Sequence, residues 1–297
     1  MRGAERGFLL LTGTLGDTNR KPLTVAQLRL LASRVRESRA ELQDRDMTVK
    51  DLTTLGYPEE TAQRILELLS ESALLERYLR RGKSAGCVPI TRVSDAYPNV
   101  LRQRLGLESP GCIWAKGDVS LLDMPKVSLV GSRDILAANR AFAWEVGAQA
   151  AKQGYALVSG NARGADRIAQ TACLNNGGIV ISVVADSLED KQEQGNILYL
   201  GECDFDQPFT AQRAISRNRL IHALPEKTFV AQSAFETGGT WDGTVKNLRH
   251  GWSPVFCYDD GSLAFRELQQ MGAVGITSGD LVNLKQLHSN NMSFFDQ

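Results

Sequence analysis

The chain has 297 residues, of which 42% are hydrophobic and 23% are charged, which is typical of a globular protein and excludes a disordered or fibrous one. The 34 basic and 34 acidic residues give a formal net charge of zero, which excludes a protein coated in positive charge but allows a local basic groove. Five scattered cysteines without a Cys-x-x-Cys pair exclude a thioredoxin-like site and are typical of reduced thiols in a cytosolic protein.

Residues 1–16 contain only a short apolar stretch. A signal peptide needs a longer apolar core followed by a small-residue cleavage site, and a transmembrane helix needs about 20 apolar residues. Neither pattern occurs, so we expect a cytoplasmic protein with no membrane partner.

The first part of the chain has the apolar spacing of helices. Residues 24–35 repeat apolar side chains at helical intervals after Thr24, a candidate N-cap. Residues 58–82 continue the pattern from a proline suited to a first helical turn to a glycine suited to its end. No heptad persists, so we expect a small helical domain over residues 1–85. Prolines interrupt residues 83–125, where we expect an irregular connection.

From residue 126 onward, short apolar segments alternate with helical ones. The predicted strands are 126–131, 155–160, 178–185, 227–233 and 254–258. The predicted helices are 138–154, 164–177, 211–224 and 240–251. Continuous apolar strands that alternate with helices indicate a parallel sheet covered on both faces. We therefore expect a doubly wound α/β domain over residues 86–297, with its binding site at the carboxyl ends of the strands.

Three predicted strand ends carry glycines or cations beside a helix start. Glycines let backbone N–H groups approach a ligand closely, and a helix N-terminus adds partial positive charge, so together they favour a phosphate. The candidates at these ends are Gly131, Ser132, Arg133, Ser159, Gly160, Arg163, Gly164, Asp166, Gly238 and Gly239. Neither GxGxxG nor GxxxxGK[ST] occurs, so a dinucleotide site and a P-loop ATPase have no support.

A further candidate segment lies in the predicted helix 211–224. Arg217 and Arg219 flank Asn218, and planar guanidinium groups make bidentate contacts with phosphates. Two arginines so close suit several phosphates in series. The alternative is that they form structural ion pairs with Asp204 or Asp206, since surface arginines usually have no special role.

Other residues have a structural interpretation beside a functional one. Arg133, taken alone, is typical of a surface cation, and Asp166 serves equally well as an N-cap or as a group that orients Arg163. His222 falls in an apolar helical stretch, which favours packing. Trp241, beside the paired glycines, is the tryptophan that we favour as a stacking platform for a base.

No catalytic constellation is evident. The three histidines lack metal-ligand spacing, no GxSxG elbow occurs, and Glu236 precedes the paired glycines, on the wrong side for a catalytic acid. We therefore expect a non-enzymatic protein with no catalytic residue, no metal and no cofactor.

The order of motifs resembles a known family. CIWAKGD precedes VSLVGSR, and GYALVSGNARGAD, RNRLIHAL and VAQSAFETGGT follow. This series is similar to the DNA-processing protein A (Smf) family. The resemblance implies an extended Rossmann-like sheet preceded by a SAM-like helical domain. It also implies a homodimer that binds and protects single-stranded DNA and assists loading of the RecA recombinase in DNA uptake, recombination and natural transformation.

By matching position, the resemblance assigns a set of residues to the DNA groove. They are Ser132, Arg133, Ser159, Gly160, Arg163, Gly164, Arg217, Asn218 and Arg219. The chain departs from the family after residue 185 and has TGGT where the family has SGSL. We expect no winged-helix tail of the kind that many members of the family have. The alternative function is a nucleotide-binding sensor or a nucleoside-monophosphate hydrolase-like protein acting in phage defence.

Overall fold

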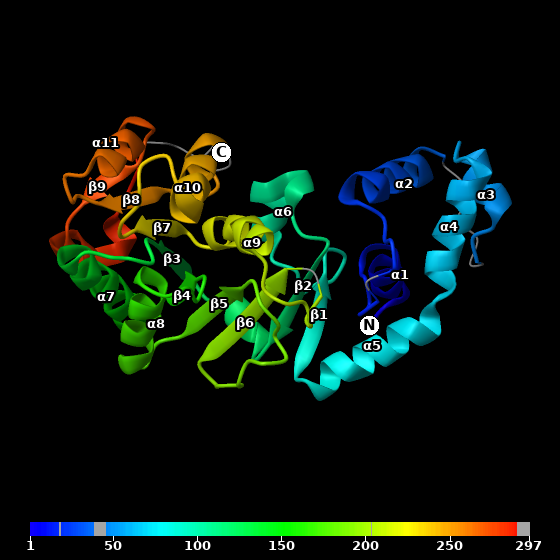
Figure 1. Cartoon of the computed structure of the whole chain (residues 1–297), viewed down its shortest axis with the longest axis horizontal. Coiled ribbons are helices and arrows are strands. Elements are labelled where there is room, and N and C mark those ends of the chain that lie inside the picture. Colours follow the sequence, from blue (N-terminus) through cyan, green and yellow to red (C-terminus); the bar gives the residue numbers. More distant parts are fainter. Residues whose placement is uncertain (18, 39–45, 203, 290–297) are drawn as a thin grey trace.

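The protein is built on one mixed sheet (Figure 1). The computed structural model describes residues 1–17, 19–38, 46–202 and 204–289. Within them the strand order is β1-β2-β6-β5-β4-β3-β7-β8-β9. The strands are β1 (Cys87–Thr91), β2 (Cys112–Lys116), β3 (Lys126–Val130), β4 (Ala156–Ser159), β5 (Val180–Val184), β6 (Ile197–Glu202), β7 (Lys227–Val230), β8 (Val255–Tyr258) and β9 (Val274–Ile276). From β6 to β9 neighbouring strands are parallel, which confirms the predicted α/β class.

Helices cover both faces of the sheet. The helices are α1 (Gly3–Thr12), α2 (Val25–Glu37), α3 (Val49–Thr54), α4 (Glu59–Ser70), α5 (Ser72–Ser84), α6 (Asn99–Leu105), α7 (Ala137–Lys152), α8 (Ala165–Asn175), α9 (Ala211–Ala223), α10 (Gly238–His250) and α11 (Leu263–Gln270). Helices α7 and α8 pack on one face, and α6, α9, α10 and α11 pack on the other (Figure 1). This arrangement is the doubly wound layering that the alternating pattern predicts.

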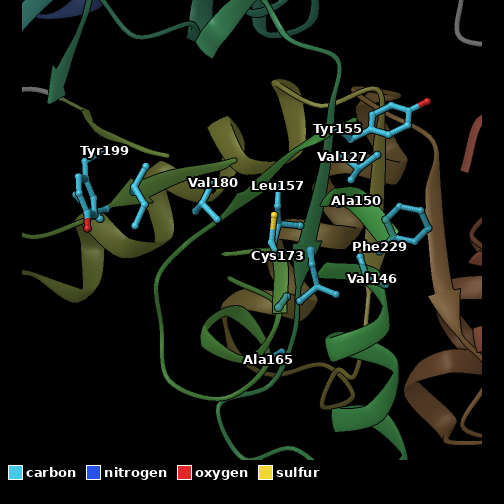
Figure 2. Packing of buried hydrophobic residues seen from close by; sticks show 14 of the residues in the cluster. Val127, Val146, Ala150, Tyr155, Leu157, Ala165, Cys173, Val180, Tyr199 and Phe229 are labelled. Atoms are coloured by element: carbon cyan, nitrogen blue, oxygen red, sulfur yellow. The ribbon is translucent and has the colours of Figure 1, made fainter. Parts of the chain in front are cut away.

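The two faces divide the side chains of each central strand between two cores. In β5, Val180 and Val184 join the cluster under α7 and α8, while Ile181 and Val183 join the cluster under α9 and α10. Figure 2 shows the first cluster, where strand and helix side chains lie together. Because successive strand residues point to opposite faces, a strand buried on both sides must be apolar throughout.

Four strands fall outside the predicted set. Strands β1 and β2 form an antiparallel pair that extends the sheet beyond β6, so the expected irregular connection over 83–125 is wrong in this part. Pro89 is tolerated in β1 because this strand lies at the edge of the sheet, where one side needs no backbone hydrogen bonds. Strands β6 and β9 complete the parallel part.

The N-terminal helices contain a small core of their own. Leu52, Ala62 and Ile65 are fully buried within it. Thr24 caps α2 as predicted, because its side chain accepts a hydrogen bond from the backbone N–H of Gln27. The helical pattern over 58–82 is not continuous.

The break between α4 and α5 falls at Glu71, which has a non-helical backbone. Its carboxylate accepts a hydrogen bond from Nε of the buried Arg20 at 2.6 Å, so the bend satisfies a guanidinium that would otherwise be buried without its charge partner.

Helix α5 joins the N-terminal helices to the sheet. The ring of Tyr78 packs 5.6 Å from that of Trp114 and 4.8 Å from that of Phe205, and its hydroxyl donates to Asp206 at 2.8 Å.

The division of the chain into two domains at about residue 85 stays a prediction. In the described ranges no helix has the length and apolarity to cross a membrane. Cys87, Cys173 and Cys257 are free thiols, and Cys203 lies outside the described residues.

His222 packs in the core as predicted and makes the fold sensitive to acid. Burial lowers its pKa to about 3, whereas the unfolded chain takes up this proton near pH 6.5. The buried neutral ring therefore costs no stability at a pH well above 6.5. As the pH falls below that value, the free energy of unfolding decreases, by about 2 kcal/mol between roughly pH 7 and pH 5. Gln in place of His222 removes this titration, so urea unfolding of H222Q should show a correspondingly flatter pH dependence. Equal pH slopes for both proteins would contradict the assignment.

Candidate nucleic-acid interface

Two loops interlock at the carboxyl ends of β3 and β4. The backbone N–H of Ala165 donates to the carbonyl of Ser132 at 3.1 Å, and the N–H of Ser132 donates to the carbonyl of Gln232 at 3.0 Å. Gly164 adopts a φ of +82°, and a Cβ there would lie 2.5 Å from the oxygen of Ser132. Only glycine fits this position, because it tolerates positive φ and leaves room for the facing carbonyl.

Asp166 holds the second loop in place. Its Oδ2 accepts hydrogen bonds from the backbone N–H groups of Gly160 at 3.0 Å and Ala162 at 3.3 Å. The N-cap position of α8 belongs to Gly164, and the guanidinium of Arg163 donates to Asp134 at 3.0 Å. Both sequence interpretations of Asp166, as an N-cap and as the group that orients Arg163, are therefore wrong. Its role is to satisfy loop N–H groups.

Three of the predicted arginines surround one cavity of about 300 Å³, here called the arginine cavity. Its lining residues are Arg133, Gly160, Asn161, Ala162, Arg163, Ala185, Asp186, Phe209, Ala214 and Arg217. Arg133 and Arg163 are exposed, whereas Arg217 on α9 is only 8% exposed. The cavity lies at the carboxyl edge of the parallel sheet, where the sequence predicts the binding site.

Arg217 is the buried cation of this cavity. Its Nη2 donates to the carbonyl of Gly160 at 2.9 Å, and its Nε has no partner among the described residues. Burial lowers the pKa of its guanidinium, and the nearby Asp166 and Asp186 act in the opposite direction. Burial likewise raises the pKa of the Asp166 carboxyl, and Arg217 opposes that shift. The guanidinium is thus held in place with hydrogen-bonding capacity to spare.

Other predicted site residues do not line the arginine cavity. The guanidinium of Arg219 pairs with Glu202 and faces a separate cavity of about 1000 Å³ beside α1 and α2. Asn218 donates to the carbonyl of Gly239 at 3.1 Å, which ties α9 to the start of α10, where Gly238 adopts a φ of +83°. The side chain of Ser159 lies inside the fold and accepts from Gln170 at 2.6 Å.

Gly131 provides close packing, because a Cβ there would lie 2.5 Å from Cβ of Ala165. The neighbouring Ser132 is half-buried and contributes its backbone to the loop contacts. These two residues help to hold the loops after β3 and β4 together, and neither lines the arginine cavity.

Two alternatives raised by the sequence are settled by the contacts. Trp241 is 7% exposed and packs edge-on against Phe235 with ring centroids 5.2 Å apart, so the stacking role proposed for it is wrong. The ion-pair alternative is right in kind for Arg219, although its partner is Glu202 rather than Asp204 or Asp206.

Sequence reasoning missed several lining residues. Asp186 lies two residues after the end of β5, so the rule that ligands bind at the carboxyl ends of strands would have found it. Phe209 precedes α9 and remains exposed, and no sequence pattern separates such a residue from an ordinary loop aromatic. Asp134, which contacts Arg163, was likewise not singled out.

Comparison with known proteins identifies the family. The family model described as DNA recombination-mediator protein A matches residues 89–260. The DNA processing protein DprA of Streptococcus pneumoniae is 30% identical over 200 residues, covering 63% of this chain and 70% of that protein. The protein Smf of Borreliella burgdorferi is 27% identical over 269 residues, covering 83% and 82%.

Solved structures agree with this result at the level of the fold. The X-ray structure of DNA processing protein A from Streptococcus pneumoniae has a TM-score of 0.68 at 22% identity and covers 90% of this chain and 99% of its own. The corresponding protein from Helicobacter pylori has a TM-score of 0.57 at 24% identity and covers 68% and 97%. Together with the family model, which spans more than half of the sequence, these findings establish that the chain belongs to the DNA recombination-mediator protein A family.

Proposed function

We propose that this chain is a non-enzymatic protein that binds single-stranded DNA at the arginine cavity. The observation that carries the proposal is the convergence of Arg133, Arg163 and Arg217 on one cavity at the carboxyl edge of the sheet. Planar guanidinium groups bind phosphate oxygens in pairs, so they position a nucleic-acid backbone well. The related DNA processing protein A of Helicobacter pylori has a single-stranded DNA binding mode, which supports single-stranded DNA as the ligand of this chain.

Binding of this kind has two physical signatures. Phosphates carry no base identity, so sequence preference should be small. Each neutralised phosphate of a single strand contributes about −0.7 to the slope of log K against log salt. If all three arginines contact phosphates, log K against log salt should have a slope of about −2 or steeper.

The test is titration of the purified chain with a fluorescently labelled dT oligomer at several salt concentrations. Arg133→Ala should weaken binding about three- to tenfold at low salt and reduce the salt slope by about 0.7, because one phosphate contact is lost. Arg140→Ala removes an exposed arginine of α7 that does not line the cavity, and it serves as the control. Tight binding of a mononucleotide without affinity for the oligomer would instead favour the nucleotide-sensor function.

Further parts of the proposal rest on family membership. They are protection of single-stranded DNA, loading of a RecA-like recombinase, a homodimer, and a cytoplasmic role in DNA uptake and recombination. Light scattering of the purified chain tests the dimer. Capture of purified RecA by the chain bound to an immobilised oligomer tests the recombinase contact.

A further inference from the structure

A carboxylate contacts one of the cations that line the arginine cavity. Both oxygens of Asp134 accept from Nη2 of Arg163, at 3.0 and 3.3 Å. The two side chains are 85% and 70% exposed, so solvent and ligands reach the pair. Arg163 is at the same time one of the three cations that line the cavity. A phosphate that approaches Arg163 must therefore displace the Asp134 carboxylate that is already paired with the guanidinium.

The main chain places this pair. Asp134 lies in the loop between β3 and α7, and Arg163 precedes the helix that starts at Ala165. The two loops are fixed to each other through the bond from Ala165 N–H to Ser132 and through the contact at Gly164, which leaves no room for a side chain. The carboxylate and the guanidinium face each other because the loops interlock.

Two carboxylates lower the positive charge around the cavity. Arg133, Arg163 and Arg217 contribute three positive charges. Asp134 pairs with Arg163, and Asp186, which lines the cavity and pairs with Lys191, adds a second carboxylate. The two carboxylates therefore weaken the attraction of the cavity for a polyanion, since that attraction depends on the local sum of charges.

We propose that Asp134 limits the affinity of the arginine cavity for single-stranded DNA by occupying Arg163, an inference that rests on the proposed function. On binding, the guanidinium exchanges this carboxylate for a phosphate oxygen. An exposed ion pair is weak, so phosphate displaces the carboxylate without any rearrangement of the loops. Asp134 thus weakens binding without blocking it.

The experiment compares Asp134→Asn and Asp134→Ala with the wild-type chain in titrations of a labelled dT oligomer. Both variants should bind about three- to fivefold more tightly at low salt, because an exposed pair no longer competes. The salt slope should stay close to that of the wild-type chain, because on this mechanism Arg163 contacts a phosphate in the bound state of all three proteins. Unchanged thermal unfolding confirms that the fold is intact, as expected for an exposed side chain.

Asp95 provides a matched control, because its ion pair is similar and does not involve the arginine cavity. Asp95 pairs with Arg2 at 3.1 Å, and these side chains are 92% and 57% exposed. Asp95→Asn removes the same charge from a similar pair that does not line the arginine cavity, and it should leave binding unchanged. An equal gain from D95N would overturn the inference, because net charge alone would then account for the effect.

The remaining outcomes separate this inference from the proposed function. Wild-type binding that R133A weakens and D134N leaves unchanged would overturn the role of Asp134 alone. Absence of oligomer binding by the wild-type chain and by D134N would overturn both. A selective gain from D134N and D134A supports both.

Discussion

Arg217→Ala should reduce the affinity for single-stranded DNA more than tenfold, the largest loss among single substitutions at the arginine cavity. Arg217 is the buried cation of the three, and its charge acts in a less polar setting than those of the exposed Arg133 and Arg163. The same substitution leaves Asp166 buried without its main opposing charge, so we expect stability to fall by about 2 kcal/mol. Oligomer titration and urea unfolding measure the two effects.

Two further variants make the prediction about Arg217 specific. Arg217→Lys keeps the charge but not the planar fork that bonds Gly160, so it should recover stability more fully than binding. Arg213→Ala serves as the control, because Arg213 lies on the same helix, donates to the carbonyl of Pro208 at 2.7 Å and does not line the cavity. An R217A protein that is folded and binds the oligomer with wild-type affinity and salt slope would contradict a phosphate contact at this residue.

The parallel part of the fold was predictable because burial on both faces produces a clear sequence pattern. Strand β5 is apolar at nearly every position, and a short apolar run that lies between two helical segments is typical of a buried parallel strand. Strands β1 and β2 are short, and one contains a proline, so their pairing depends on the sheet edge that β6 provides. Local sequence does not encode that edge.

The arginines of α9 show where sequence reasoning about the site went wrong. Arg217 and Arg219 are two positions apart, and a helix turns about 100° per residue, so their side chains diverge by about 200°. Only Arg217 can then face the loops after β3 and β4, while Arg219 reaches Glu202 on the other side. Helical geometry alone was sufficient to separate them.

The pair between Asp134 and Arg163 was not predictable in the same way. The two residues are 29 positions apart, and their contact depends on how the loops after β3 and β4 interlock through Ser132 and Ala165. No periodicity links residues in two separate loops. Contacts of this kind become visible only once the tertiary structure is known.

Gly147→Ala should destabilise the fold by about 2 kcal/mol, although alanine is the better helix former. Gly147 lies in α7, and a Cβ there would overlap the carbonyl oxygen of Ala169 in α8 and lie 2.8 Å from its carbonyl carbon. The obstacle is backbone, which cannot rotate away, so the two helices must separate. Overpacking of this kind costs about 1–3 kcal/mol or more, against a gain of about 1 kcal/mol from helix propensity. Urea unfolding gives the net effect.

Gly7→Ala isolates the propensity contribution. Gly7 lies inside α1, and nothing lies within 4 Å of a Cβ built there, so alanine should stabilise the protein by about 0.5–1 kcal/mol. The opposite signs expected for the same substitution in two helices follow from the close approach of α7 to α8. A G147A protein as stable as G7A would show that these helices can move apart freely, and it would contradict the tight packing on this face of the sheet.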